Sequence, residues 1–193
     1  MKVNLPTRVG TRVAVCVSGG FDSAVLWHMV KQECNEREME CKAYTVPKAD
    51  GAVFHANNVL ERFGYEHKTI VVGNIDSDNP TDHLNSGVWE IYKQGLADVV
   101  YTAVTAYYEG MSPINARTFT KGTKYEDFVR QPFADMTKDA VVKLAFDLGI
   151  EKDVMEVTHS CTTQERGRCK TCPWCVERDW AFKQINKEDI GKE

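Results

Sequence analysis

The chain has 193 residues, of which 42% are hydrophobic and 27% charged, and its formal net charge at pH 7 is −4. These proportions are typical of a globular protein, and the length suffices for one α/β domain with a small appendage. The acidic balance argues against an extended nucleic-acid surface, which needs clustered Lys and Arg. Neither a signal peptide nor a membrane span of roughly 20 apolar residues is recognisable, so a cytoplasmic protein without membrane contact is expected.

The stretch Val13–Ser23 reads V-A-V-C-V-S-G-G-F-D-S. Its unbroken apolar run, β-branched at alternate positions, predicts a strand buried on both faces of a parallel sheet. Two glycines then allow a sharp turn, and Asp22 or Ser23 is expected to cap a helix that runs to about Cys34. The start of that helix, with the hydroxyls of Ser18 and Ser23, predicts an anion site.

The next part of the chain alternates helices and strands as far as residue 102. Strands are expected at 41–46, 67–72 and 98–102, and helices at 53–63 and from Thr81 or Asp82 to Gly95. Such alternation predicts an α/β fold with a doubly wound parallel sheet. Val46 ends the second strand, where open α/β sheets bind ligands, so Val46 and the loop 48–51 are candidate neighbours of an adenosine; a solvated turn is the alternative for that loop.

Regular periodicity is lost from Ala103 to Gln131. Aromatic residues are too frequent there for disorder, so we predict a substrate lid with some local structure. Four of its basic residues are expected to meet phosphates or a carboxylate, namely Arg117, Lys121, Lys124 and Arg130. The alternative is a solvated basic loop.

A further helix is expected from about Lys138 to Leu148, closed by Gly149. A lysine in the first turn of a helix opposes the helix dipole unless an anion lies between them. Lys138 is therefore predicted to contact a phosphate.

Four cysteines lie within fifteen residues near the end of the chain: Cys161, Cys169, Cys172 and Cys175. Four thiolates can close a tetrahedral shell with no position left for water, which is the arrangement of a structural Zn²⁺ site. Such a site would fold a tail over 153–193 beside a main domain over 1–152. An iron–sulfur cluster is the rival, although the ferredoxin run expects a further cysteine where Asp179 stands.

The string S-G-G-F-D-S, placed between a buried strand and a helix, resembles the pyrophosphate loop (PP-loop) of the ATP pyrophosphatases. An ordinary Ser/Gly turn is the alternative. The resemblance implies an adenine nucleotide alpha hydrolase-like fold that uses ATP and Mg²⁺. It also implies that Ser18, Gly19, Gly20, Phe21, Asp22, Ser23 and Lys138 hold the ATP phosphates during attack at the α-phosphate. Ser18, Asp22, Ser23 and Lys138 are the implied catalytic residues.

Three separated blocks together resemble the 7-cyano-7-deazaguanine synthase (QueC) family: residues 18–23, residues 132–149 and the cysteine run from 160 to 175. The resemblance implies that a 7-deazaguanine carboxylate is adenylated by ATP and converted with ammonia to an amide. A second adenylation then gives the nitrile, with release of AMP and pyrophosphate. In this interpretation Arg117, Lys121 or Lys124 orients the carboxylate or phosphates, and Tyr107 or Tyr108 lies against the heterocycle. Family members are commonly dimers, so a homodimer is a further expectation.

The sequence departs from the family pattern after the second strand, where it reads Val46–Gly51, and after the fourth, where residues 102–104 and 112–117 differ. Two alternatives therefore remain open. One is another PP-loop ATP pyrophosphatase, such as a tRNA thiolase or a nucleotide amidotransferase. The other is a noncatalytic QueC-like protein that binds nucleotides.

Overall fold

The computed structural model describes residues 3–8, 10–48, 51–73, 80–111, 117 and 119–191, without the side chains of 80–83. Residues 49–50 of the loop 48–51 and residues 112–116 considered above lie outside the described residues, as do the side chains of Thr81 and Asp82. No helix among the described residues is long and apolar enough to cross a membrane. The elements in chain order are β1 Val13–Cys16, α1 Phe21–Glu36, β2 Cys41–Thr45, α2 Ala52–Arg62, β3 Ile70–Val71, α3 Pro80–Lys93, β4 Val99–Tyr101, β5 Val129–Arg130, α4 Lys138–Asp147, α5 Glu151–Val157 and α6 Pro173–Gln184.

The strands form one parallel sheet in the order β3-β2-β1-β4-β5. Val13 of β1 pairs with Cys41 on one side and with Val99 on the other, which makes β1 the central strand. The chain moves outward from β1 to β3 and then returns to β4 on the opposite side of β1. This reversal confirms the predicted doubly wound sheet, and ligands bind beyond the carboxyl ends of the strands at such a switch point.

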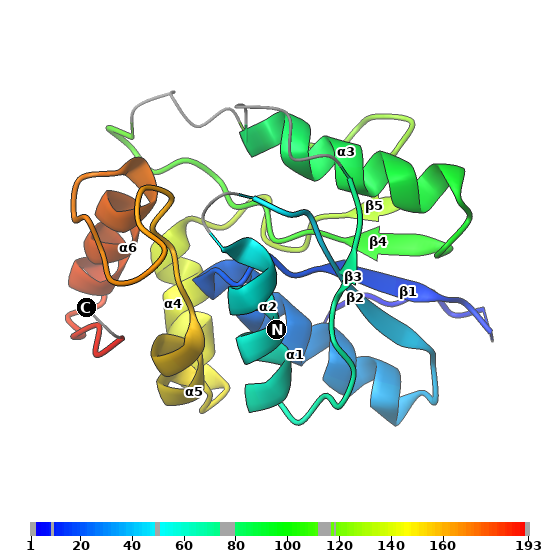
Figure 1. Ribbon diagram of the computed structural model, residues 1–193, viewed down its shortest axis with the longest axis horizontal. Helices are drawn as coiled ribbons and strands as arrows, with labels where there is room; N and C mark the ends of the chain where they lie inside the picture. Colours follow the sequence, from blue (N-terminus) through cyan, green and yellow to red (C-terminus); the bar gives the residue numbers. More distant parts are fainter. Residues whose placement is uncertain are drawn as a thin grey trace.

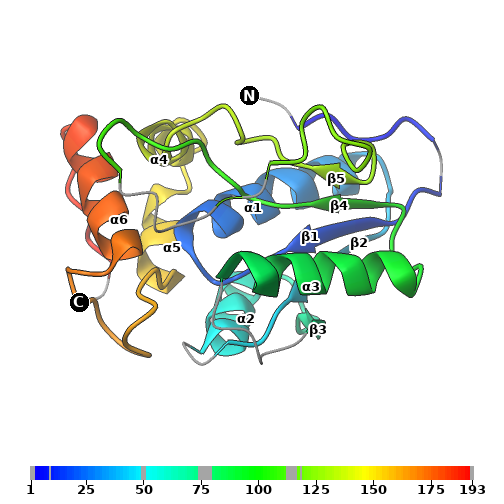
Figure 2. The ribbon, with the colours of Figure 1, turned by 90° about the horizontal axis from the view of Figure 1, so that it is seen from above.

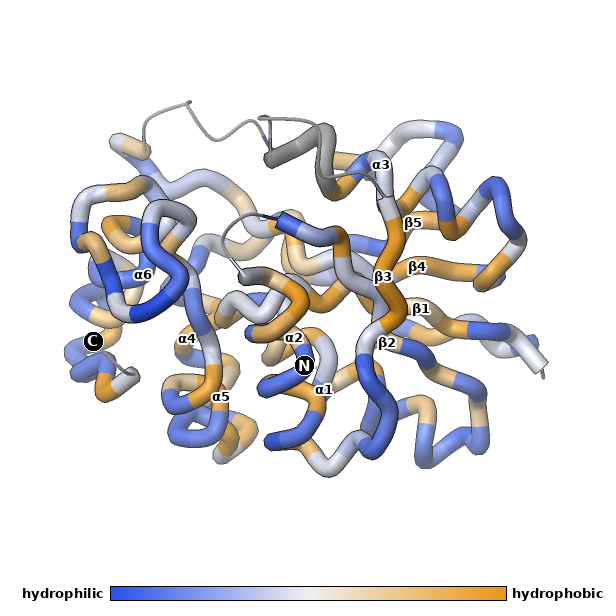
Figure 3. Tube along the Cα trace, viewed as in Figure 1, coloured by the Kyte–Doolittle hydropathy of each residue, from blue (hydrophilic) through white to orange (hydrophobic). Residues whose placement is uncertain are grey.

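Helices cover both faces of the sheet (Figures 1 and 2). Alternate residues of β1 supply the two cores: Val13 and Val15 belong to a large core shared with α1, α2, α4 and α5, whereas Ala14 belongs to a smaller core with Ile91 of α3. Figure 3 shows the strands as largely hydrophobic, as the burial of a parallel sheet on both faces requires. Because alternate residues of β1 face two different cores, the strand is apolar at every position.

The start of α1 differs from the prediction. The helix begins at Phe21 with Gly20 as its N-cap residue, and neither Asp22 nor Ser23 caps it. Asp22 lies in the first turn, where its negative charge favours the positive end of the helix dipole. The capping prediction was wrong because the helix begins directly after the two glycines, so its N-cap lies two residues before Asp22 and three before Ser23.

The C-terminal part contains structure that periodicity did not reveal. The two residues of β5 extend the sheet from within the segment 103–131, and α5 and α6 follow α4. Ala181 and Phe182 of α6 belong to the large core, and the Phe182 ring meets the Phe21 ring edge-on at 5.7 Å between centroids. The last helix is thus packed directly against the residue at the start of α1.

Candidate nucleotide site and metal centre

A cavity of about 240 Å³ lies beyond the carboxyl ends of the central strands. Its walls come from the segment after β1, the end of β2, the segment after β4, the start of α4 and the residues that follow α5. Among the predicted site residues the lining includes Ser18, Gly20, Phe21, Asp22, Ser23, Val46, Arg117, Lys138 and Cys161. The cavity therefore lies at the position that the strand order favours for a ligand.

The loop after β1 is held by its own serines. Ser23 Oγ donates a hydrogen bond to the Gly20 carbonyl at 3.0 Å and accepts one from the Ser18 backbone N–H at 3.2 Å. The first intrahelical bond runs from Ala24 N–H to the Gly20 carbonyl at 3.1 Å. The N–H groups of the residues before Ala24 therefore lie at the positive end of α1, where an anion is favoured.

The two glycines of this loop differ in what surrounds them. Gly19 has φ +79°, and a Cβ placed there would lie 2.3 Å from Cβ of His55 on α2. At Gly20 a Cβ would meet Ser18 Oγ at 3.4 Å, which is an ordinary contact. Gly19 is thus required for the approach of the loop to α2, whereas Gly20 faces the cavity.

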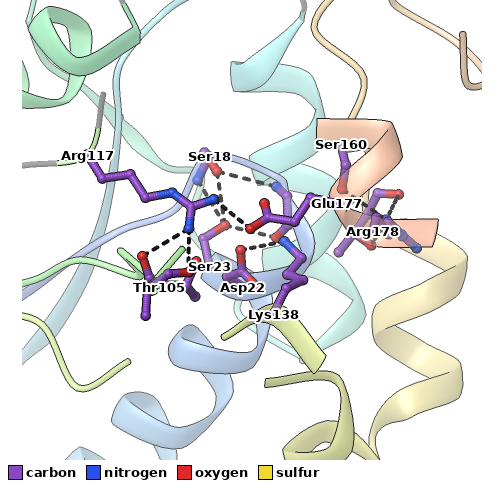
Figure 4. A network of polar contacts seen from close by, with 12 residues as sticks. Ser18, Asp22, Ser23, Thr105, Arg117, Lys138, Ser160, Glu177 and Arg178 are labelled. Carbon is purple, nitrogen blue, oxygen red and sulfur yellow. Dashed lines mark hydrogen bonds and ion pairs between the residues drawn. The ribbon is translucent and has the colours of Figure 1, made fainter. Parts of the chain in front are cut away.

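An ion pair joins the loop to α4 across the floor of the cavity (Figure 4). Nζ of Lys138, the first residue of α4, lies 2.5 Å from Oδ2 of Asp22. The Lys138 side chain is buried, and Oδ1 of Asp22 is buried with no hydrogen-bond partner among the described residues. A buried carboxylate oxygen without a donor is suited to a cation such as Mg²⁺, whose preferred ligands are oxygens.

Arg117 also lines the cavity, but its guanidinium is already engaged. Nη2 forms a buried ion pair with Oε1 of Glu177 on α6 at 2.6 Å, and Nη1 donates to the Thr105 and Ala106 carbonyls at 3.0 and 2.7 Å (Figure 4). The Arg117 backbone N–H donates to Tyr107 Oη at 2.7 Å. These contacts hold the segment after β4 against α6 beside the cavity.

The other predicted substrate residues lie away from the cavity lining. Tyr108 stacks on Trp180 with 4.1 Å between centroids, and Tyr107 lies under the Arg117 guanidinium. Lys121 pairs with Asp135 at the surface, and Lys124 lies over the ring of Tyr125. Of the five predicted substrate contacts, the structure thus brings only Arg117 together with the loop and Lys138.

Two further groups of residues line the cavity. Residues 102–105 follow β4, and all but Thr102 belong to the predicted lid that begins at Ala103. Residues 159–162 and Trp174 come from the segment that carries the cysteines. Sequence periodicity gives no indication that this segment lies against residues 18–23, which we call the phosphate loop after their predicted role.

The four predicted metal-ligating cysteines come together. Their Sγ atoms all lie within 4.8 Å of one another, and those of Cys169 and Cys175 are 4.0 Å apart. Four sulfurs bound tetrahedrally to one Zn²⁺ at 2.3 Å would be about 3.8 Å apart, so the donor set fits a single zinc ion. Cys169 and Cys172 lie in the loop between Cys161 and the start of α6, and Cys175 lies in the first turn of α6.

Hydrogen bonds prepare this cluster for metal binding. Those from Thr163 and Thr171 lower the pKa of Cys169 to about 5, so its sulfur is a thiolate at neutral pH, the form that binds metals. Burial, together with the neighbouring Cys172, raises the pKa of Cys175 to about 12. A coordinated metal would nevertheless deprotonate that thiol, because a bound cation lowers the pKa of its ligands.

Contacts also connect residues 159–172, which we call the cysteine loop, with the phosphate loop. The His159 backbone N–H donates to the Gly19 carbonyl at 2.9 Å, and the His159 ring stacks on that of His55 at 4.3 Å. Ring Nε2 of His55 and of His159 lie 3.1 and 2.6 Å from the carbonyls of Glu165 and Gln164. The cysteine loop is therefore fixed against the loop that precedes α1.

Comparisons with known proteins agree with these features. Residues 106–186 match the family described as queuosine biosynthesis protein QueC. This range contains Lys138 and all four cysteines. The match is a similarity of this segment, which makes up less than half of the chain. The matched range begins after β4, so the family likeness is carried by α4, the cysteine loop and α6.

Two solved structures are similar to the chain at low identity. The U34-tRNA thiolase NcsA from Methanococcus maripaludis, solved with its [4Fe-4S] cluster, has a TM-score of 0.50 at 15% identity and covers 93% of this chain. NAD⁺ synthetase from Burkholderia pseudomallei has a TM-score of 0.45 at 19% identity and covers 77%. The chain spans 66% and 64% of the lengths of these two proteins.

Proposed function

We propose that the protein is an ATP-dependent carbon–nitrogen ligase that converts 7-carboxy-7-deazaguanine with ammonia into the amide, the nitrile or both. The observation that carries this proposal is the position of Lys138. It lies in the segment that matches the QueC family, and its amino group reaches Asp22 in the S-G-G-F-D-S loop. The family segment and the phosphate loop thus build one cavity.

The proposed roles follow from the geometry of that cavity. The start of α1 and the hydroxyls of Ser18 and Ser23 hold the β- and γ-phosphates of ATP, and Lys138 offsets their charge. Asp22 supplies the buried Oδ1 as a ligand for Mg²⁺, which would neutralise the phosphates when bound. Val46, which lines the cavity at the end of β2, is placed for contact with the adenosine. We expect these residues to hold and orient ATP for attack at its α-phosphate.

The chemistry takes two rounds. A carboxylate oxygen attacks the α-phosphate, pyrophosphate leaves, and ammonia displaces AMP from the acyl adenylate to give the amide and a proton. In the second round the amide oxygen attacks the α-phosphate of another ATP, and pyrophosphate and one amide proton leave. Loss of AMP and of the second N–H proton then gives the nitrile. In both rounds the chain would act mainly by positioning the reactants and by stabilising charge.

The cysteine cluster supports a structural role for Zn²⁺ in this proposal. Its sulfur spacing suits a single ion, whereas a [4Fe–4S] cluster binds each cysteine to a separate iron and spreads the sulfurs further apart. Cys161 also lines the cavity of about 240 Å³ in which we propose that ATP binds, called the nucleotide cavity from here on. Bound zinc would thus fix the wall that residues 159–162 contribute.

The test is incubation of the purified protein with ATP, Mg²⁺, ammonium and 7-carboxy-7-deazaguanine, followed by mass spectrometry. AMP and pyrophosphate release that depends on the deazaguanine, with the amide or nitrile as product, is the expected result. Accumulation of the amide alone would indicate a site that adenylates once. AMP release that does not depend on the deazaguanine, with neither product formed, would remove the substrate assignment.

A further inference from the structure

A second cavity, of about 450 Å³, lies between α3 and the segment that carries β5. Four aromatic residues dominate its walls: Trp89, Tyr92, Tyr125 and Phe128. The Trp89 ring stacks on Tyr92 with 5.3 Å between centroids and meets Tyr125 edge-on at 6.2 Å. The volume lies within the range of about 300–1,000 Å³ that small-molecule sites occupy. Flat walls of this kind are suited to a planar ring system.

This aromatic cavity adjoins the nucleotide cavity. Leu84 of α3 and Thr102, the residue after β4, line both. Thr102 stands at the carboxyl end of β4, beside the switch point of the sheet. A ligand held in the aromatic cavity can therefore direct one end toward a nucleotide bound beyond β1.

The polar lining of the aromatic cavity is uncharged throughout its described residues. Among them, the Gln131 side chain is fixed at both ends: Oε1 accepts from the Thr120 N–H at 2.8 Å, and Nε2 donates to Thr102 Oγ1 at 3.3 Å. Asn85 adds a second carboxamide. Burying a charged group against such a lining would be unfavourable, so the part of a ligand that enters it is neutral and has hydrogen-bonding edges.

We propose that the aromatic cavity holds the neutral fused heterocycle of the second substrate, with its carboxylate directed past Leu84 and Thr102 toward the α-phosphate of ATP. This inference rests on the proposed function and identifies where its purine-like substrate binds. It replaces the expected position against Tyr107 or Tyr108, which line neither cavity. The carboxylate remains outside the neutral cavity and close to the cations of the nucleotide cavity.

The experiment measures ligand binding in three single variants, Trp89→Ala, Gln131→Ala and Phe54→Ala. Phe54 is an exposed aromatic residue of α2 outside both cavities and is the matched control. Calorimetric titration with ATP and with 7-carboxy-7-deazaguanine gives separate dissociation constants. We expect the deazaguanine to bind at least tenfold more weakly to Trp89→Ala and Gln131→Ala, with unchanged affinity for ATP. Phe54→Ala should match the wild type for both ligands.

Two further measurements separate failure of this inference from failure of the proposed function. Suppose that the wild type forms AMP with the deazaguanine. If Trp89→Ala and Gln131→Ala then bind the deazaguanine as tightly as the wild type, or if Tyr108→Ala is the variant that loses this binding, the cavity assignment is overturned and the proposed function stands. If no AMP forms but guanine binds in a manner that depends on Trp89, the cavity assignment stands and the reaction fails. Absence of heterocycle binding in the wild type, or dissociation of a dimer by Trp89→Ala in sedimentation, would also overturn the cavity assignment.

Discussion

Nη2 of Arg117 lies 2.6 Å from Oε1 of Glu177, and both side chains are almost fully buried although the residues are 60 positions apart. The pair joins the segment after β4 to α6, beside the nucleotide cavity. Breaking a buried ion pair by removing one partner leaves an uncompensated charge in the interior, which typically costs about 3–5 kcal/mol.

The first prediction concerns this pair. Glu177→Ala should lower the free energy of unfolding by about 3–5 kcal/mol, because Arg117 keeps its charge without its carboxylate. Urea unfolding followed by circular dichroism measures the change. Lys121→Ala is the control, since Lys121 pairs with Asp135 in full contact with solvent and should leave the midpoint almost unchanged. Equal midpoints for Glu177→Ala and the wild type would show that the pair contributes nothing.

The second prediction concerns Asp22 and Lys138. Asp22→Ala and Lys138→Ala should each abolish AMP formation, because the first removes the proposed metal ligand and the second the proposed phosphate contact. Lys143→Ala, on the exposed face of the same helix, should retain wild-type AMP formation. The assay is release of AMP from ATP in the presence of the deazaguanine. Undiminished release by either cavity variant would remove that residue from the proposed machinery.

Features that depend on residues close together in the sequence were predictable from it. The predicted strand, glycine turn and helix at 13–34 depend on neighbours in the sequence, and the structure has all three. Lys138 was predicted to contact a phosphate because a lysine at the start of a helix is electrostatically unfavourable without an anion. The structure places it in the cavity lining beside Asp22, and the phosphate contact stays a prediction. The cysteine cluster was recognisable from its spacing, and the structure gathers the four sulfurs.

The remaining features depend on contacts between distant segments. Arg117 was expected at a ligand, yet its partner Glu177 lies on a helix that the sequence pattern did not reveal. The strand β5 has two residues, too few for a period of two to be detected. The aromatic cavity combines side chains of α3 and of the segment around β5, so no single stretch of sequence contains it.

The third prediction separates the two glycines of the phosphate loop. Gly19→Ala should destabilise the fold and displace the loop, since its Cβ would overlap His55 and its φ is unfavourable for an L-residue. Gly20→Val should leave the fold largely intact but abolish AMP formation, because it adds bulk where ATP approaches the backbone. Thermal unfolding together with the AMP assay distinguishes the two effects. A stable, active Gly19→Ala protein would contradict the close approach to α2.

The fourth prediction concerns the metal. The purified protein should contain about one zinc per chain and be colourless, and Cys172→Ser should lose zinc and be labile or insoluble. Elemental analysis and the visible spectrum report the metal directly. Cys34→Ala, a buried cysteine outside the cluster, should keep its zinc. A brown protein with visible charge-transfer absorption would indicate an iron–sulfur cluster and favour the thiolase alternative.

The last prediction concerns Asp189, which holds two arginines beneath the cysteine loop. Its carboxylate accepts from Nε of Arg178 at 2.7 Å and lies 2.6 Å from Nη1 of Arg168. Burial alone would raise the pKa of Asp189, but the two guanidinium groups outweigh it and lower the pKa below the ordinary aspartate value. The stability that results is fully present above the unfolded pKa of about 3.9 and is lost as the pH falls through the lower folded pKa.

Asp189→Asn should therefore unfold more easily than the wild type at pH 7, because two arginines lose their counter-charge. The difference in unfolding free energy should shrink as the pH falls below about 4, because the unfolded chain then binds a proton that the folded wild type binds only at a lower pH. Urea unfolding at pH 7, 5, 4 and 3 measures it. Asp179→Asn, which removes an exposed pair with Lys183, should follow the wild type throughout. A difference between Asp189→Asn and wild type that stays constant from pH 7 to 3 would show that the effect arises from packing rather than from the charge of Asp189.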